Sequence, residues 1–131
     1  MPFELTMLAA GSALGLVHIV LASHSASAQR GYRWTASPRD EPRPPLTGVA
    51  GRLARASTNF GETFPFFVAA VLMAQMVDAH DWRTVWGSGI YVGARVIYLP
   101  LYAGGIYLVR SLVWNVAIVG VALLVWAAIA Q

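Results

Sequence analysis

The sequence predicts an all-α fold, a four-helix transmembrane bundle that forms a single domain over residues 1–131. Hydrophobic residues make up 57% of the chain and charged residues only 11%, whereas soluble domains usually carry about 25% charged residues. The apolar residues fall into four blocks, and each block is close to the roughly 17–25 residues that cross a bilayer as a helix. Because the backbone inside a membrane has to satisfy its own hydrogen bonds, we expect each block to be helical.

The four predicted spans follow one another with one long connection between the first two. The spans cover about 3–22, 60–77, 85–109 and 112–129, and the connection covers about 23–57. Prolines predict a stiff, irregular middle for this connection; they are Pro38, Pro42, Pro44 and Pro45.

The first block also has one feature of a cleaved secretory signal, because Ala26-Ser27-Ala28 resembles a cleavage site. Its amino-terminal end, however, carries Glu4 and no lysine or arginine. Its apolar region is also longer than the roughly 7–15 residues of a signal. We therefore expect this block to remain as the first span.

Arginine placement predicts the orientation of the spans. Arginine accumulates in the cytoplasmic connections of membrane proteins, and most arginines of this chain lie between the first and second spans or between the third and fourth. These are Arg30, Arg33, Arg39, Arg43, Arg52, Arg55 and Arg110. Only Arg83 lies on the opposite side, so both connections are expected in the cytoplasm and both termini outside. For the first four arginines we favour contact with anionic lipid headgroups.

A first polar stripe precedes and enters the second span. Arg52, Arg55, Asn59 and Glu62 are spaced three, four and three residues apart, which puts them on one face of a helix. A carboxylate at the edge of a span is costly unless it is paired. Glu62 is therefore expected to have a partner.

A second polar stripe lies in the third span, where Tyr91, Arg95, Tyr98 and Tyr102 again share one helical face. The tyrosines alone would be explained by aromatic packing. An arginine inside a span normally faces the bundle interior with a partner, so we expect an Arg95–Glu62 pair, either direct or through Tyr98.

Both stripes point towards the cytoplasmic side, where Arg110 opens the fourth span. The amino end of a helix carries a partial positive charge, and with Arg110 it would stabilise an anion or a thiolate. The sequence therefore predicts a pocket for a small, polyanionic ligand from the cytoplasm, with an apolar second substrate arriving from the lipid.

These residues resemble the MAPEG family, the membrane-associated proteins in eicosanoid and glutathione metabolism, and the bacterial branch in particular. The family pattern of Arg, Asn, Glu and Pro is met by Arg55, Asn59, Glu62 and Pro65. The pattern of the third helix is met by Ala94-Arg95 with Tyr98 and Tyr102, and the Arg-Ser pair of the last helix by Arg110-Ser111.

The resemblance implies a homotrimer in the bilayer, here a bacterial inner membrane, that binds glutathione as co-substrate between neighbouring subunits. Arg110 would hold the thiol as thiolate, or Ser111 would hydrogen-bond the sulfur, and the thiolate would conjugate or reduce a small lipophilic electrophile. The glutathione-binding residues would be Arg52, Arg55, Asn59, Glu62, Arg95, Tyr98 and Tyr102.

Two other functional classes stay open: a non-catalytic scaffold that binds lipid or a partner, and a small four-span exporter. The exporter ranks last, because its first span should carry a central carboxylate and this one has only Glu4 at its edge. No metal site is expected, since His18 and His24 lack companion ligands. The chain has no cysteine and no nucleic-acid motif.

Overall fold

The structure is a computed structural model that describes all 131 residues. It contains five helices and no strands, which confirms the all-α prediction. The helices are α1 (Phe3–Arg30), α2 (Tyr32–Ala36), α3 (Gly48–Met76), α4 (Trp82–Ala103) and α5 (Leu108–Ile129).

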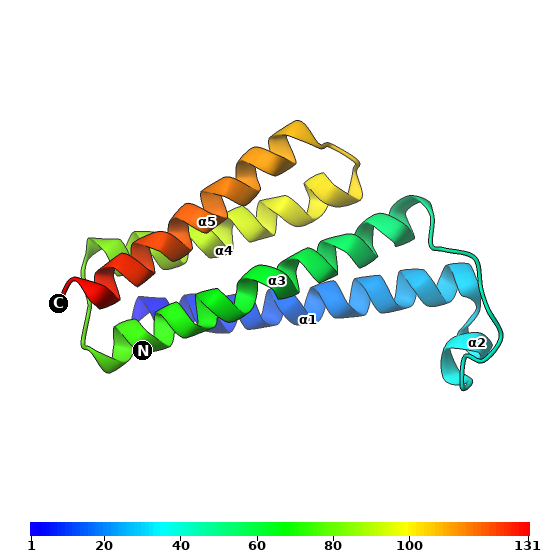
Figure 1. Ribbon diagram of the computed structural model, residues 1–131, viewed down its shortest axis with the longest axis horizontal. Helices are drawn as coiled ribbons and strands as arrows, with labels where there is room; N and C mark the ends of the chain where they lie inside the picture. The colour runs from blue at the N-terminus through cyan, green and yellow to red at the C-terminus, as the bar shows by residue number, and fades with distance from the viewer.

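The four long helices form two hairpins (Figure 1). One hairpin pairs α1 with α3, and the other pairs α4 with α5. Between the hairpins, α3 contacts both α4 and α5, and α1 contacts α4 but does not reach α5. The hairpins lie close together at the end that holds both termini and separate towards the α4–α5 turn (Figure 1). This separation opens one end of the molecule.

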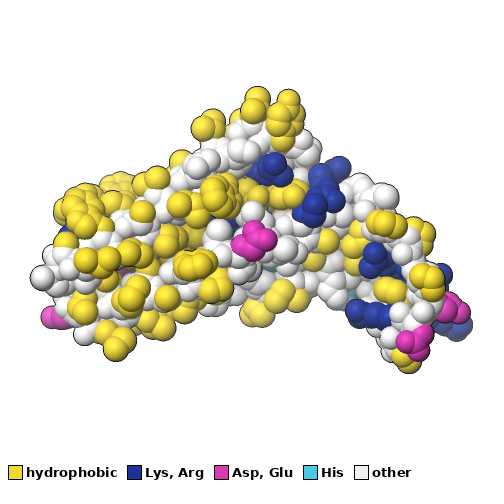
Figure 2. Space-filling model, in the orientation of Figure 1, with side chains coloured by type: hydrophobic (Ala, Val, Ile, Leu, Met, Phe, Trp, Pro, Cys, Tyr) yellow, Lys and Arg dark blue, Asp and Glu magenta, His cyan; other side chains and the backbone are white.

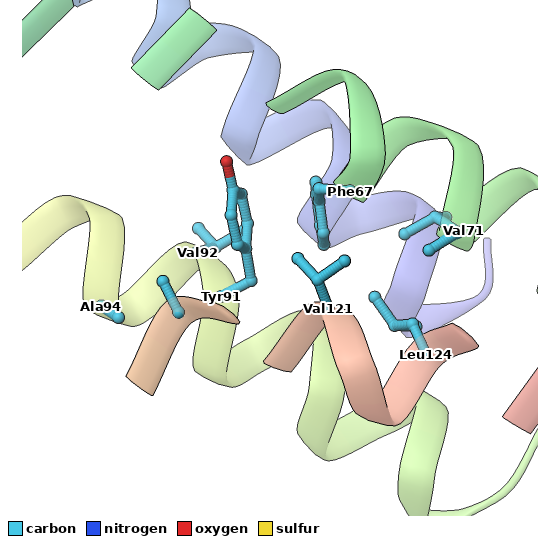
Figure 3. Packing of buried hydrophobic residues seen from close by; sticks show 9 residues of the cluster. Phe67, Val71, Tyr91, Val92, Ala94, Val121 and Leu124 are labelled. Atoms are coloured by element: carbon cyan, nitrogen blue, oxygen red, sulfur yellow. The ribbon is translucent and has the colours of Figure 1, made fainter. Parts of the chain in front are cut away.

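The core lies where α3, α4 and α5 meet (Figure 3). Phe67 stacks on the ring of Tyr91 with 4.2 Å between ring centroids, and the Tyr91 hydroxyl hydrogen-bonds Thr63 Oγ1 at 2.9 Å. On α4 and α5 the backbones themselves touch at Gly87 and Gly120. A Cβ built on Gly120 would lie only 2.6 Å from the Gly87 carbonyl oxygen, so this approach requires glycine.

A capping box at Asp81 fixes the start of α4. The Asp81 carboxylate accepts hydrogen bonds from the backbone N–H of Arg83, at 2.7 Å, and from its guanidinium. The guanidinium bond lowers the pKa of Asp81 below its ordinary value of 3.8 and raises the pKa of Arg83. Nearby, the buried Glu4 carboxylate accepts a hydrogen bond from Thr84, which holds the beginning of α1 against α4.

The helices differ in extent from the predicted spans. α1 continues to Arg30 and α3 begins at Gly48, so only the middle of the 23–57 connection lies outside long helices. The stretch 23–30 is rich in alanine and serine and has no glycine or proline before Gly31, which takes a φ of +98°. Residues 104–107, which fall inside the predicted third span, form a turn instead, because Gly105 adopts a φ of +75°.

Two helices, α1 and α5, are long and apolar enough to cross a membrane. α3 and α4 are less apolar because they carry the polar residues of the two stripes. Large hydrophobic side chains nevertheless cover much of the outer surface (Figure 2), including Leu16, Ile19, Leu112 and Val119. Apolar surface of this extent marks contact with lipid or with partner chains, in agreement with an integral membrane protein.

Candidate functional site

A polar cavity of about 440 Å³ lies between α3, α4 and α5, towards the end where the hairpins separate. Figure 2 shows arginine side chains near this opening. The cavity is lined by Asn59, Tyr98, Tyr102, Arg110, Ser111, Trp114 and Asn115. The first five were predicted as site residues and are brought together from three helices.

Arg110 lies in the first turn of α5, directly after the glycine turn that ends α4. Its Cζ atom lies 4.5 Å from the centroid of the Tyr102 ring, and no carboxylate lies within ion-pair distance. Tyr102 in turn makes an edge contact with Tyr98 at 5.6 Å. The aromatic rings therefore orient an uncompensated guanidinium at the amino end of a helix, which is a favourable position for an anion.

Ser111 hydrogen-bonds within its own helix. Its hydroxyl donates to the Tyr107 carbonyl at 3.0 Å, and the Asn115 side-chain N–H donates to the Ser111 carbonyl at 2.9 Å. The Ser111 hydroxyl is exposed and would have to release Tyr107 before it could donate to a ligand. Arg110 needs no such rearrangement.

Arg95 is fully buried behind the cavity rather than in its wall. Its guanidinium donates to the Asn59 side-chain oxygen at 2.8 Å and lies 4.2 Å from the Tyr98 ring centroid. Because the oxygen of Asn59 is taken, its amide N–H groups are left as donors towards the cavity. Arg95 thus sets the orientation of two cavity residues.

The predicted Arg95–Glu62 pair is wrong. Arg95 bonds Asn59, and Glu62 is exposed without an ion pair. Residues three apart on a helix differ in direction by about 60°. This rotation is enough to turn Asn59 towards α4 while Glu62 is exposed on the side of α3 that lies next to α5.

The two arginines of α3, Arg52 and Arg55, have different surroundings. Arg52 donates from Nε to the carbonyl oxygen of Ala103, the last residue of α4, at 2.8 Å. Arg55 is exposed and has no hydrogen-bond or ion-pair partner. Neither residue lines the cavity. The first stripe is therefore one helical face by spacing, but only Asn59 reaches the cavity of its own chain.

A larger apolar groove of about 750 Å³ runs along α3 and α5 beside the polar cavity. It is lined by Glu62, Thr63, Phe66, Ala69, Met73, Trp114, Ile118, Val121, Ala122, Val125, Trp126 and Ile129. Trp114 belongs to both spaces, and its buried indole N–H has no hydrogen-bond partner. The indole therefore stands at the boundary between a polar compartment and an apolar one.

Trp114 and Asn115 were not predicted from the sequence. Both follow predicted residues by four positions, Trp114 after Arg110 and Asn115 after Ser111, so they lie one turn further on the same face. With Arg110 and Ser111, Asn115 is one of the few polar side chains on α5. A polar residue in an otherwise apolar helix could have indicated that Asn115 belongs to the site.

Comparison with known proteins adds one finding. A family model described as the MAPEG family matches residues 7–130, nearly the whole chain. A comparison with curated proteins gives no match.

Proposed function

The chain belongs to the MAPEG family, and from this premise we propose an integral membrane enzyme that conjugates or reduces lipophilic electrophiles with glutathione. Family membership supports a membrane glutathione transferase-like or related role. The observation that carries the finer proposal is the position of Arg110, unpaired in a polar cavity that adjoins an apolar groove.

The donors of the cavity suit a peptide-like polyanion. Glutathione carries two carboxylates and two amide groups, and the cavity offers a guanidinium, two phenol groups and two side-chain amides. In the proposal, Tyr98 and Tyr102 contact the ligand directly. Arg95 acts through Asn59, whose N–H groups it leaves free.

Arg110 supplies the chemistry in this proposal. A nearby cation favours a thiolate over a thiol, and the thiolate is the nucleophile. The thiol proton leaves to water through the open end of the cavity. The sulfur then forms a bond to the electrophilic carbon of the second substrate while that carbon releases its leaving group. With a hydroperoxide, the thiolate instead attacks the outer oxygen and breaks the O–O bond: the sulfur becomes a sulfenic acid, the alkoxide takes a proton from water and leaves as an alcohol, and a second glutathione reduces the sulfenic acid to the disulfide and water.

The groove along α3 and α5 would bring the second substrate to this sulfur. Ten of its twelve lining residues are hydrophobic, as expected for a site that receives molecules dissolved in lipid. Trp114 lines both spaces and would contact both substrates through its ring.

The proposed assembly is a homotrimer with the ligand between subunits. Its support is the pair of exposed residues that one chain leaves without partners, Arg55 and Glu62. Both come from the α3 face that the family resemblance assigns to glutathione. In the trimer, they would complete the polar cavity of the neighbouring chain; in their own chain neither lines that cavity, and Glu62 lines the apolar groove.

The membrane topology belongs to the same proposal. All four long helices would cross a bacterial inner membrane as one four-helix domain over residues 1–131, with both termini outside. The arginine-rich ends of α1, α3 and α5 would lie in the cytoplasm, where the open cavity meets soluble thiols.

Thiolate formation tests this function directly. The ultraviolet absorbance of the thiolate is followed by stopped flow after the detergent-purified protein is mixed with glutathione. We expect a signal in the wild type that is lost in Arg110→Ala and retained in Arg83→Ala, which removes an arginine at the opposite end. Wild-type protein that gives no thiolate and no conjugation would refute the enzyme and leave the non-catalytic scaffold.

A further inference from the structure

The segment between α1 and α3 is a built structure rather than a free linker. Short α2 is fastened to the last turns of α1 by two side-chain bonds, Tyr32 Oη to His24 Nδ1 at 3.1 Å and Thr35 Oγ1 to Ser27 Oγ at 2.9 Å. Further along, the Gln29 side chain makes three bonds to Thr47, just before α3 begins. Ordering a loop costs conformational entropy. The ordered conformation of this segment therefore indicates that its side chains have a function.

Trp34 gathers two arginines in this segment. The guanidinium carbons of Arg30 and Arg39 lie 5.4 and 5.6 Å from its ring centroid, and its indole N–H donates to the Glu41 carbonyl at 2.7 Å. Arg39 adopts a φ of +62° and bonds the Thr35 carbonyl through its side chain. Arg39 thus adopts a left-handed backbone conformation, and two guanidinium groups lie near one ring. A bound anion would reduce the electrostatic repulsion between these two cations.

The charges of this segment are mostly unpaired. Arg30, Arg33, Arg39 and Arg43 face only two carboxylates, Asp40 and Glu41, and the only ion pair among them joins Arg43 to Glu41 at 3.8 Å. Arg33 has no hydrogen-bond or ion-pair partner. It lines a small cavity of about 340 Å³ with Trp34 and Arg43, and both carboxylates, Asp40 and Glu41, line the same cavity. Figure 2 shows basic and acidic side chains together at this end of the molecule.

The depth of the segment matches the lipid headgroups. The exposed apolar side chains of α1 end at Leu21, and α2 is fastened beside His24 and Ser27. At 1.5 Å per residue these lie about 5–9 Å beyond the apolar belt. The headgroup layer of a bilayer is about 5–8 Å thick on each side. With α1 upright in the bilayer, the residues to which α2 is fastened would therefore fall at about the level of the phosphates.

We infer that the Trp34 arginine cluster, formed by Arg30, Arg33, Arg39 and Arg43, binds the phosphate groups of anionic phospholipids in the leaflet at this end. The inference shares with the proposed function the membrane placement of α1, but it does not depend on thiol chemistry. Trp34 lies beside Arg30 and Arg39, while Arg33 and Arg43 would reach the headgroup from the small cavity, where Asp40 and Glu41 oppose the binding of an anion.

Native mass spectrometry of the detergent-purified full chain tests this inference. The protein is mixed with equal amounts of phosphatidylglycerol and phosphatidylcholine of the same acyl chains, and retained lipid is counted. We expect the wild type to prefer phosphatidylglycerol. We expect the double variant Arg33→Gln/Arg43→Gln to lose most of that preference, about fivefold for each arginine near a charged surface.

Two variants serve as controls. Arg83→Gln removes an arginine from the opposite end and should keep the preference, and Asp40→Asn/Glu41→Gln should increase it. Arg33 and Arg43 are exposed, so thermal unfolding should show that the double variant is folded. Equal retention of both lipids by the wild type, or an unchanged preference in the double variant, would overturn the inference.

Competition identifies the source of the phosphate. Displacement of the lipid by millimolar inorganic phosphate would indicate a soluble anion as the ligand and would contradict the assignment to lipid. Persistence of lipid under the same conditions supports it. Because thiolate formation is measured separately, loss of lipid preference with an intact thiolate signal would refute this inference and leave the proposed function standing.

Discussion

Arg52 joins the start of α3 to the end of α4 across the open side of the molecule. The family resemblance implied a role for it in glutathione binding, but its Nε atom donates to the Ala103 carbonyl at 2.8 Å. That carbonyl lies at the carboxyl end of a helix, where the partial charge is negative and cations are stabilising. We therefore predict that Arg52→Ala loosens the turn from α4 to α5.

The structure gives the size of this effect. A hydrogen bond to a charged group contributes about 1.5–3 kcal/mol, and because Arg52 is only half-buried we expect a loss of about 1–2 kcal/mol. The unfolding entropy is about 2.1 cal/mol/K per residue, which for 131 residues gives a decrease in Tm of about 4–7 °C. Arg110 follows the same turn, so thiolate formation should fall as well.

Thermal unfolding and glutathione titration of the same samples distinguish a structural role of Arg52 from direct binding of glutathione by Arg52. Arg52→Ala should lower both Tm and the thiolate signal. The matched control, Arg55→Ala, removes an exposed arginine without a partner from the same helix and should weaken glutathione binding without lowering Tm. If Arg52→Ala weakens glutathione binding at an unchanged Tm, Arg52 does not stabilise the turn from α4 to α5 and instead binds glutathione directly.

Two further predictions concern packing and pH. Gly120→Ala should destabilise the protein by about 2–3 kcal/mol, because the added methyl group would lie 2.6 Å from the Gly87 carbonyl oxygen. Gly93→Ala serves as the control and should not destabilise the protein, because the space around Gly93 is open. Equal Tm values for the two variants would contradict this explanation. The lowered pKa of Asp81 means that its contribution to stability is present above the unfolded value of 3.8 and is lost as pH falls through the folded value. The Tm difference between wild type and Asp81→Asn should therefore be constant near neutral pH and vanish in acid, whereas a gap that persists at low pH would argue against it.

The sequence predicted which residues of α4 face the interior, because periodicity alone determines that. Arg95 and Tyr98 share a face and are both buried. It could not predict the partner of Arg95, since spacing along one helix does not give its rotation against another. Asn59 and Glu62 are three positions apart, and the rotation of α3 alone decides which of them meets Arg95.

Helix ends and connections were harder to predict from the sequence. Gly104 and Gly105 are plain turn residues, but the apolar residues on either side keep the hydropathy of the segment high and hide the end of α4. The order of the α1–α3 segment was also missed, because it depends on contacts such as His24 with Tyr32. Contacts between distant side chains leave no periodic pattern in a sequence.

The close backbone approach at Gly87 and Gly120 has a mechanical consequence. It locks α4 and α5 into one rigid arm, so the cavity can change width only by rotation of that arm against α1 and α3. α4 has 22 residues and is about 33 Å long at 1.5 Å per residue. A rotation of about 5° at the closed end therefore moves the far end of the arm by about 3 Å, so a small change in core packing produces a larger change in the width of the cavity mouth.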